Sequence, residues 1–478
     1  MDKKGSVCSL FCLELIHMHT FNLPYFKDSF VWFDCIRFDD TPMFLDSCFS
    51  DKKNNQINRY DIICSNPFIK LTDLGTKTSI QKDGVDFLSD ESFISIVDIM
   101  SEDFKKNFKT EGELPFEGGF IGYLAYEFNH SSDKFLSIPI ARANAYKTVI
   151  IIDHHEEQAY LVSHEDKVFA ENYHQKLLDQ LNHPKKEQAK FNIEGNLEPQ
   201  KDFEAYCKKF NKIQDYIVNG DVYQVNLATN FTVKYSGDPW IFYKQFRKIN
   251  QSSYMAYINF EDFSIISGSP EQFISIKDNI IVSRPIKGTM PRGKDETSDE
   301  KLKLKLMSSE KDRAENLMIV DLIRNDLGKN CETGSVQVKD LFALESYPNV
   351  HHLVSTIEGK LLSNISAWIA YCDAFPGGSI TGAPKQRSME IISELEEFAR
   401  EVYCGSIFYL SFSGSMNSNI AIRTLVAKNG VLNYFSGGGI TRGSSAQSEF
   451  QEIQDKAANI ENVITYFRRD NDSRGNNQ

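Results

Sequence analysis

Residues 273–293 read FISIKDNIIVSRPIKGTMPRG and combine a predicted hairpin with a lysine in an unusual position. Two apolar runs meet at Asp278 and Asn279, a pair typical of a tight turn between antiparallel strands. The second run leads through Pro285 into Lys287 and then into a glycine. The hairpin therefore presents Lys287 at a defined place, as a surface side chain, a point charge for an anion or a nucleophile.

The composition of the 478-residue chain is that of a globular protein with one large core or two to three ordinary ones. Hydrophobic residues make up 41% of the chain and charged residues 25%. The net charge of -13 disfavours broad contact with nucleic acid or with an anionic membrane. An anionic substrate would therefore need cations gathered at its site, or a metal ion.

The cysteine pattern and the N-terminus both favour a cytoplasmic protein. Nine cysteines are spread between Cys8 and Cys404 without a C-x-x-C pair, which is typical of a reducing compartment. The N-terminal apolar segment is interrupted by Glu14 and His17 and is followed by no small-residue cleavage site. No window approaches the roughly 18 apolar residues of a membrane span. We expect a cytoplasmic chain that binds neither nucleic acid nor membrane.

The sequence pattern divides the chain into two regions. Residues 1–182 alternate strand-like and helical segments, and residues 201–467 carry sharper signals. Between them, residues 183–200 lose periodicity and gain charge, proline and glycine, which is typical of a linker or a long connection. The polar residues 468–478 predict a disordered tail.

Local composition predicts the main elements. Strands are expected where β-branched and aromatic residues gather, in SFVWFDCIRF (29–38), RYDIICSNPFIKL (59–71) and KTVIIIDHHEEQAYLVSH (147–164). Helices are expected where apolar residues recur at helical spacing, over 201–221, 308–329, 383–400 and 448–467.

Two of these helices carry carboxylates three residues apart. Asp312 and Glu315 share one face of the first, and Glu449 and Glu452 share one face of the last, with Lys456 one turn beyond. Such pairs are ordinary on a solvated surface. If the two faces met, they would instead suit Mg²⁺, which takes one or two protein carboxylates and completes its shell with water and substrate oxygens.

Two glycine-rich segments suit either ordinary turns or anion binding. GGSITGAPK (377–385) places Ser379 and Thr381 as possible caps of a helix, and FSGGGITRGSS (435–445) predicts a flexible loop rich in free amides. Neither matches a P-loop or a dinucleotide fingerprint.

Three further residues, an arginine and two histidines, lie in or next to strand-like segments and are candidates for a binding pocket. Arg423 lies inside the apolar strand pattern NIAIRTLVA, so it should meet an anion, either a protein carboxylate or a substrate. His351 and His352 adjoin a strand-like run, and alternation points them to opposite faces, so at most one of them belongs to a given pocket.

Nine segments occur together in a specific order and carry a resemblance. They are SGSPEQF, SRPIKGTMPRG, DRAENLMIVDLIRNDLG, VHHLVSTIEG, GGSITGAPK, YCGSIFYLSFSG, IAIRTL, SGGGIT and SEFQEIQDKA. In this order they resemble the chorismate-utilising enzymes, densely over 201–467 and more loosely before, where MFLDSCF and GGFIGYLAYEF are similar. The resemblance implies an α/β (α+β) fold of two packed β-sheets flanked by helices, to which the N-terminal region adds strands.

The residue between PI and GT separates the family's activities. Lysine, here Lys287, is typical of members that form 4-amino-4-deoxychorismate, whereas alanine is typical of those that form anthranilate, isochorismate or salicylate. The resemblance thus implies amination of chorismate for p-aminobenzoate and folate synthesis. The alternatives are an anthranilate-forming enzyme, against which the lysine argues, and a non-catalytic chorismate-binding relative.

The resemblance also implies roles for individual residues. Lys287 would attack the chorismate ring, Glu271 would act as acid and base for the departing hydroxyl, and His352 would assist near C4. A lysine in water is protonated at neutral pH, so this attack requires a site that removes the proton.

Binding roles follow from the same resemblance. Mg²⁺, bound to the ring carboxylate, would be held by Glu315 and Glu452 with Asp312 and Glu449 nearby. The groups that would bind the rest of chorismate are Ser379, Tyr403, Arg423, Gly437, Gly438, Gly439 and Lys456.

Two expectations concern partners. The chain contains no cysteine in a G-x-C-x-G nucleophile elbow, so we expect ammonia to come from a separate glutaminase subunit or from solution. The segments around Ser47 and Arg59 resemble those that bind tryptophan in relatives, although Asp46 departs from the usual residues there.

Overall fold

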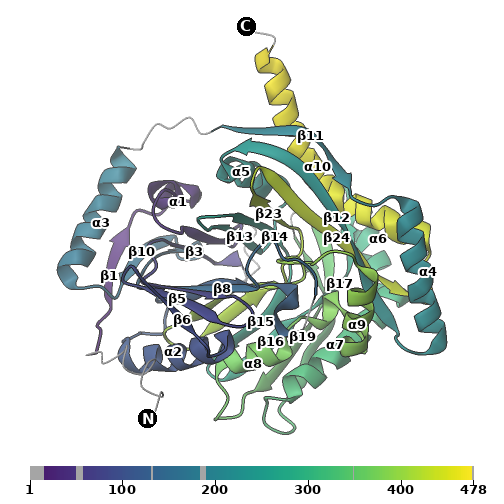
Figure 1. The fold of residues 1–478 in the computed structure, drawn as a ribbon, viewed down its shortest axis with the longest axis horizontal. Coiled ribbons are helices and arrows are strands. Elements are labelled where there is room, and N and C mark those ends of the chain that lie inside the picture. Colours follow the sequence, from purple (N-terminus) through teal and green to yellow (C-terminus); the bar gives the residue numbers. More distant parts are fainter. Residues whose placement is uncertain (1–14, 50–57, 131–132, 184–189, 348, 476–478) are drawn as a thin grey trace.

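The computed structural model describes residues 15–49, 58–130, 133–183, 190–347 and 349–475. In these residues two twelve-stranded antiparallel sheets face each other, and helices cover their outer sides (Figure 1). The prediction of two packed β-sheets flanked by helices is confirmed.

The first sheet runs in space from β1 to β11. Its strands are β1 (His19–Leu23), β10 (Gln158–Ser163), β9 (Thr148–Asp153), β3 (Tyr60–Cys64), β2 (Met43–Asp46), β13 (Tyr254–Asn259), β14 (Ser264–Ser269), β23 (Thr424–Lys428), β24 (Val431–Thr441), β12 (Gln224–Gly237) and β11 (Phe191–Pro199), with β20 (Gly382–Ala383) paired to β12.

The second sheet runs from β17 to β6. Its strands are β17 (Ile286–Pro291), β19 (Val350–Lys360), β16 (Ile280–Arg284), β15 (Gln272–Lys277), β22 (Met416–Asn419), β21 (Ser406–Ser411), β7 (Gly119–Leu124), β8 (Ala141–Tyr146), β4 (Ile69–Asp73), β5 (Thr78–Lys82) and β6 (Val85–Ser89), with β18 (Gln337–Ser346) paired to β19.

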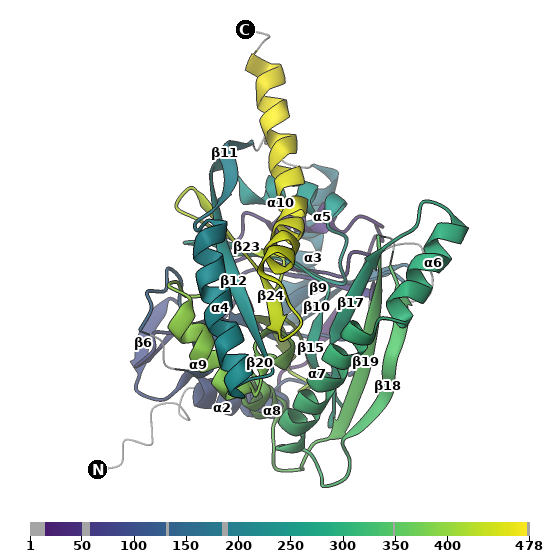
Figure 2. The same cartoon turned by 90° about the vertical axis from the view of Figure 1, so that its right-hand side faces the viewer.

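The helices pack on the outer faces and at the edges. They are α1 (Phe30–Ile36), α2 (Phe93–Asn107), α3 (Lys167–Asn182), α4 (Phe203–Asn219), α5 (Pro239–Ile249), α6 (Glu296–Met307), α7 (Glu310–Gly328), α8 (Ala367–Ala374), α9 (Lys385–Leu395) and α10 (Ala446–Gly475), with the 3₁₀ turns η4 (Tyr126–Asn129) and η5 (Gly378–Ile380). Figure 2 shows α7 and α10 on the same side of the molecule, α7 over β17 and β19 and α10 over β24.

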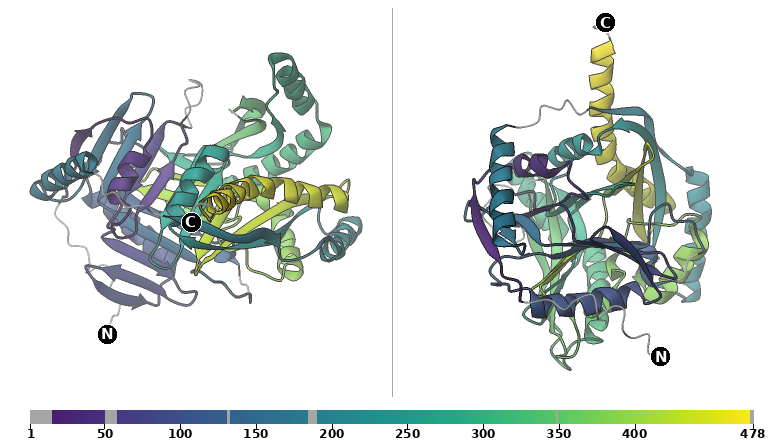
Figure 3. Two further views of the ribbon diagram at one scale, coloured as in Figure 1. Left: turned by 90° about the horizontal axis from the view of Figure 1, so that it is seen from above. Right: turned by 60° about the vertical axis from the view of Figure 1, so that its left-hand side comes forward.

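Both sheets pass without a break from N-terminal to C-terminal strands. In the first, β2 pairs with β13, so that Met43 lies opposite Ile258. In the second, β7 pairs with β21, so that Gly119 lies opposite Ser411. The N-terminal strands therefore form one half of each sheet and the C-terminal strands the other (Figure 3).

The hairpin predicted around Asp278 and Asn279 is confirmed. β15 and β16 pair with Lys277 opposite Ile280, and Asp278 and Asn279 both have positive φ, at 52° and 60°. Two such residues form the mirror-image turn that matches the twist of paired strands. Past Pro285 the chain continues as β17, and β16 and β17 pair in succession with the same long strand, β19.

One predicted strand is wrong. Within 29–38, Phe30–Ile36 forms the helix α1, in which Phe30, Phe33 and Ile36 are buried. Their spacing places them on one face, and the ring of Phe33 packs 4.4 Å from that of Trp240 on α5. Helical spacing thus outweighs the β preference of single residues here. The strands predicted in 59–71 and 147–164 are confirmed as β3 with β4 and as β9 with β10.

The predicted linker and tail need correction. Within 183–200, Phe191–Pro199 is the edge strand β11, where Phe191 lies opposite Gly237 of β12, while residues 184–189 lie outside the described residues. A strand paired to a distant segment need not show local periodicity. The predicted tail also begins too early, because α10 continues to Gly475.

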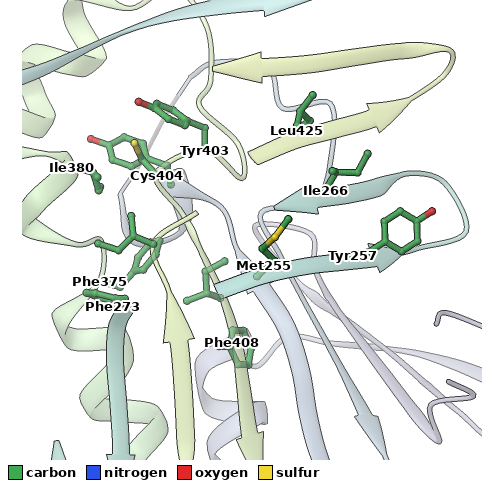
Figure 4. Packing of buried hydrophobic residues seen from close by; sticks show 14 of the residues in the cluster. Met255, Tyr257, Ile266, Phe273, Phe375, Ile380, Tyr403, Cys404, Phe408 and Leu425 are labelled. Carbon is green, nitrogen blue, oxygen red and sulfur yellow. The ribbon is translucent and has the colours of Figure 1, made fainter. Parts of the chain in front are cut away.

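The apolar core lies between the sheets and under the helices. Figure 4 shows Phe273 and Phe375 lying together near Ile380, with Tyr403 and Cys404 above them. In the described residues the cysteines are free thiols, most of them buried. Over the same residues, no helix combines the length and apolar character needed to cross a bilayer.

Asp61 and His154 form a buried pair that gives stability a pH dependence. His154 Nε2 lies 2.8 Å from Asp61 Oδ2, and both side chains are inaccessible to solvent. Burial alone would lower the pKa of His154, but the Asp61 carboxylate outweighs it and raises the pKa above 6.5. The same pair lowers the pKa of Asp61 to about 2, against the effect of burial.

Because the pKa of His154 is raised on folding, its contribution is complete below pH 6.5 and is lost as pH rises through the folded value. His154→Gln should therefore cost about 3 kcal/mol of unfolding free energy at pH 6 and less at pH 9. Urea unfolding across this range measures the difference. The exposed neighbour His155→Gln is the control; an equal loss at every pH would contradict the expectation.

Candidate functional site

Lys287 points from β17 toward the loop formed by residues 374–385. Its Nζ donates a hydrogen bond of 2.9 Å to the backbone oxygen of Ser379 in η5. The Ser379 hydroxyl is buried without a hydrogen-bond partner among the described residues. The lysine is half-buried and fixed at its tip, which excludes the surface alternative for this side chain.

Glu271 immediately precedes β15 and is close enough to Lys287 to be affected by its charge. It is 4% exposed, and its Oε1 has no hydrogen-bond partner in the described part of the chain. Burial raises the pKa of this carboxyl above its ordinary value, and the positive charge of Lys287 opposes the shift. A carboxyl whose pKa is raised by burial holds its proton more readily than an exposed one, as a group that gives a proton to a leaving hydroxyl must.

His352 and His351 face opposite sides of β19, as alternation predicts. His351 Nε2 lies 2.9 Å from Asp299 of α6, whereas His352 Nδ1 lies 2.9 Å from Thr289 Oγ1 of β17. Burial, with the charge of Arg423, lowers the pKa of His352 to about 3, so its imidazole is neutral at physiological pH. His352 lies opposite Thr289, which follows Lys287 by two residues along β17.

Arg423 lies between β22 and β23 with a positive φ of 50°. Its side chain has no ion pair or hydrogen bond to any described residue, and burial lowers its pKa. The protein-carboxylate alternative is therefore wrong for the described residues. A half-buried arginine with no protein anion among the described residues is suited to a carboxylate brought by a ligand.

The predicted flexible loop at 435–445 is instead largely a strand. Gly437, Gly438 and Gly439 lie in β24, opposite Ala228, Leu227 and Asn226 of β12. A Cβ at these glycines would lie 2.8 Å from Tyr403 Oη, 3.0 Å from Glu449 Oε2 and 2.2 Å from Gln224 Nε2, respectively. The glycines are therefore required because other side chains cross the strand. Pairing of β24 with β23 ends at Tyr434, so the backbone beyond is open at that edge.

Tyr403 and Lys456 line this glycine segment. Tyr403 stacks on Phe435 with ring centroids 5.7 Å apart. Lys456 of α10 donates to the backbone oxygen of Gly437 at 2.8 Å and pairs with Glu452 at 2.8 Å. Burial would raise the pKa of Glu452, but Lys456 outweighs it and the pKa is lowered.

The carboxylate-bearing faces of α7 and α10 lie next to each other, as the alternative of a Mg²⁺ site requires. Lys311 Nζ lies between them, 4.0 Å from Glu315 Oε1 of α7 and 3.9 Å from Glu449 Oε1 of α10. Burial raises the pKa of Glu315, with Lys287 and Lys311 opposing and Asp312 and Glu449 adding to the rise. Asp312 also lies against Gly288, where a Cβ would be 3.1 Å from its side chain.

These residues fit Mg²⁺ in type and number. Nowhere in the described residues do three or more histidine, cysteine, aspartate or glutamate side chains converge closely enough to hold a metal unaided. Two carboxylates, however, already lie within 4.0 Å of a cation, the Lys311 ammonium, and Mg²⁺ needs only one or two protein carboxylates when substrate oxygens complete its shell.

Most of the predicted site residues are brought together. The charge of Lys287 acts on Glu271, Glu315 and Glu452, and that of Arg423 acts on His352. The prediction that Ser379 or Thr381 caps a helix is wrong: α9 begins after Pro384 and has no side-chain cap. Ser379 contributes its backbone oxygen to Lys287 because the loop passes over α7, where Gly378 adjoins Leu322.

The two residues expected to bind an effector lie elsewhere. Ser47 lines a cavity of about 320 Å³ between the sheets, and its hydroxyl donates to Asp61 at 2.7 Å. Arg59 is not among the lining residues and pairs with Asp153 at 2.6 Å. Effector binding by Ser47 and Arg59 stays a prediction.

Sequence reasoning missed three residues that hold the site. Lys311 bridges the two carboxylate faces; its i,i+4 spacing to Glu315 is visible in the sequence, but its approach to Glu449 is not. Lys385 donates to Ala374 O at 2.7 Å and pairs with Asp326 of α7 at 3.1 Å, which closes the base of the 374–385 loop. Arg400 holds the same loop through the Ile380 oxygen.

The arrangement can therefore bind a small dianion and act on it with a lysine. One end offers an unpaired arginine, a tyrosine and an open glycine edge. The other offers carboxylates suited to a divalent cation, with a lysine and a buried glutamate between the two.

The family comparison agrees with this chemistry. A family profile described as "chorismate binding enzyme" matches residues 48–462. The chain is 38% identical to aminodeoxychorismate synthase component 1 of Escherichia coli K12 over 425 residues, which cover 87% of this chain and 92% of the relative. It is 31% identical to anthranilate synthase component 1 of Bacillus subtilis 168, covering 85% and 84%.

A solved structure shares the fold. Anthranilate synthase component I from Streptococcus pneumoniae TIGR4 aligns with a TM-score of 0.73 at 30% identity, over 86% of this chain and 93% of that one. The two-sheet architecture described above is thus common to both proteins.

Proposed function

Because this chain belongs to the family of chorismate binding enzymes, we propose that it converts chorismate and ammonia to 4-amino-4-deoxychorismate. It is an enzyme of this family, and its similarity to the Escherichia coli synthase supports the product. The observation that carries the proposal is the placement of Lys287, held at its tip by the Ser379 oxygen and acting electrostatically on Glu271, Glu315 and Glu452.

Lys287 is the proposed nucleophile. Its neutral amine attacks C2 of the chorismate ring, the double bonds shift, and the C4 hydroxyl departs as water. Ammonia then attacks C4, the double bonds shift back and the lysine leaves from C2. The buried Glu271 supplies the proton for the departing hydroxyl and can take one from the amine, because burial raises its pKa.

His352 orients the reacting face. Its imidazole is neutral, since burial and the charge of Arg423 lower its pKa to about 3, and it is fixed by Thr289 at 2.9 Å. A neutral, oriented imidazole donates or accepts a hydrogen bond near C4 without adding a charge.

Each of the two carboxylates of chorismate is assigned to a different group of binding residues. Arg423, Tyr403 and the open edge of Gly437 to Gly439 receive the enolpyruvyl carboxylate, supported by the absence of a protein anion for Arg423 among the described residues. Ser379 and Lys456 line the ring.

The ring carboxylate is assigned to the acidic side. Mg²⁺ would be held there by Glu315 and Glu452, with Glu449 and Asp312 adjacent, and when bound it would neutralise the carboxylate and position the ring. The contact of the Lys311 ammonium with Glu315 and Glu449 supports a cation at this place.

Ammonia is proposed to come from a separate glutaminase subunit or from ammonium in solution. The chain contains no nucleophile elbow of its own, which supports a source of ammonia outside this chain.

Product identification tests the proposal. We expect the purified chain with chorismate, Mg²⁺ and ammonium to yield 4-amino-4-deoxychorismate, converted to p-aminobenzoate only when a pyruvate lyase is added. Excess chelator should remove the activity and added Mg²⁺ restore it. Release of anthranilate would instead identify the related aromatising reaction, and unchanged chorismate would indicate a binding protein; either contradicts the proposal.

A further inference from the structure

A small cavity lies between η4, the end of α9 and the segment that leads to Tyr403. Its volume is about 10 Å³, close to the least space that holds one water-sized molecule. It is lined by Tyr126, Glu127, His130, Lys134, Ile392, Ser393, Glu396, Phe398 and Arg400.

Two polar atoms of this lining lack partners. Tyr126 is 2% exposed, and its Oη has no hydrogen bond to any described residue. Nδ1 of His130 is buried and equally unpartnered, and the two rings meet edge to face with centroids 5.0 Å apart. Buried polar atoms are rarely left unsatisfied, so these two call for a small molecule between them.

Three charged groups of the lining, Arg400, Glu396 and Glu127, already have partners. Arg400 and Glu396 form an ion pair of 2.6 Å with both side chains 1% exposed. Glu127 accepts hydrogen bonds from the amides of Arg400 and Glu401, at 2.7 and 3.1 Å. Burial, with the charge of Arg400, lowers the pKa of His130 to about 4, so its ring is neutral. The unpartnered groups therefore suit a small neutral molecule that both donates and accepts hydrogen bonds.

Arg400 connects the cavity to the site. Its guanidinium lies between two rings, with Cζ 4.7 Å from the centroid of Tyr126 and 5.8 Å from that of Tyr403. It donates to the oxygen of Ile380, next to Ser379, and to the oxygen of Asn226, which pairs with Gly439. Arg400 therefore contacts both the cavity lining and segments that carry residues assigned to chorismate.

We propose that this cavity is the ammonia-binding site of the enzyme, in which Tyr126 and His130 hold ammonia before it enters the chorismate site past Arg400. The inference rests on the proposed function, which requires ammonia as second substrate. Ammonia matches the cavity because it is as small as water, neutral, and both a donor and an acceptor.

Steady-state kinetics with ammonium chloride and the full chain tests this assignment. Tyr126→Phe and His130→Phe each remove a polar atom and keep an aromatic ring in place. Each should raise the KM for ammonium between about threefold and tenfold, the range of one lost hydrogen bond, and leave the KM for chorismate unchanged. The double variant should exceed either single one.

Tyr371→Phe is the matched control. Its hydroxyl is also buried and unpartnered, but Tyr371 lies on α8 and does not line the cavity. It should leave both KM values unchanged. Folding of each variant is checked by thermal unfolding and by binding of chorismate alone.

The outcomes separate this inference from the proposed function. If the wild type forms no aminated product, the proposed function fails and this inference with it. If the wild type aminates chorismate but both cavity variants keep its KM for ammonium, or change the KM for both substrates alike, the cavity holds structural water only and the inference alone is overturned.

Discussion

Replacement of Lys287 by alanine is expected to reduce the amination of chorismate at least about a thousandfold, because a covalent nucleophile has no substitute in the site. Chorismate should still bind, since Arg423 and the acidic side remain. The measurement is product formation under saturating ammonium, with chorismate binding determined separately. A fall in kcat with little change in affinity would identify a residue that acts in the chemical step.

Lys277→Ala is the control for this experiment. Lys277 lies on the same hairpin, at the end of β15, and is exposed. It should keep full activity. Unchanged product formation by Lys287→Ala would contradict the assignment.

Intact-mass analysis examines the covalent step directly. Wild type incubated with chorismate and Mg²⁺, without ammonia, should gain the mass of chorismate less one water. Lys287→Ala should gain nothing. The same adduct on both proteins would exclude Lys287 as the attacking group.

The second large effect is expected at Arg423. Arg423→Met should raise the KM for chorismate by about 30-fold or more, the cost of removing one partner of a buried charge-assisted contact. The free energy of unfolding should nevertheless stay equal or increase, because no described protein anion is deprived of a partner and burial disfavours the charge. Substrate kinetics and urea unfolding of one variant measure both quantities.

Arg400→Met is the comparison variant, because it removes an arginine that does have a protein carboxylate as partner. Arg400 is more deeply buried than Arg423, at 1% exposed, and it is paired with Glu396 at 2.6 Å. Its removal leaves Glu396 buried and unpaired, and should cost about 3–5 kcal/mol of unfolding free energy. A similar loss in Arg423→Met would show that Arg423 serves stability and would contradict its assignment to substrate.

The local elements were largely predictable because their signals are local. Asp278 and Asn279 adopt the positive φ values that a two-residue hairpin needs. The helix predicted over 201–221 is α4, which Asp202 caps at its start and Gly220 ends in the left-handed conformation. The predictions fail where a distant segment decides the outcome, as in α1, whose aromatic face packs on Trp240, and in β11, whose partner is β12.

The functional site likewise has features that the sequence predicts and features that only the structure shows. The motif order and the lysine of PIKGT identify the family and the candidate site residues. The sequence shows that Asp312 and Glu315 share a helix face, as Glu449 and Glu452 do. It does not show that Lys311 joins the two faces, nor that the glycines of β24 make room for Tyr403, Glu449 and Gln224.

The sequence by itself determined the family, the helices and hairpins, and the set of residues from which the site is made. Tertiary structure alone decided which of these residues meet, that Arg423 has no carboxylate among the described residues, and that Tyr126, His130 and Arg400 line one cavity. The physical reason is range: turns, caps and periodicity act over a few residues, whereas contacts such as Lys287 with Ser379, 92 residues apart, exist only after both sheets have formed.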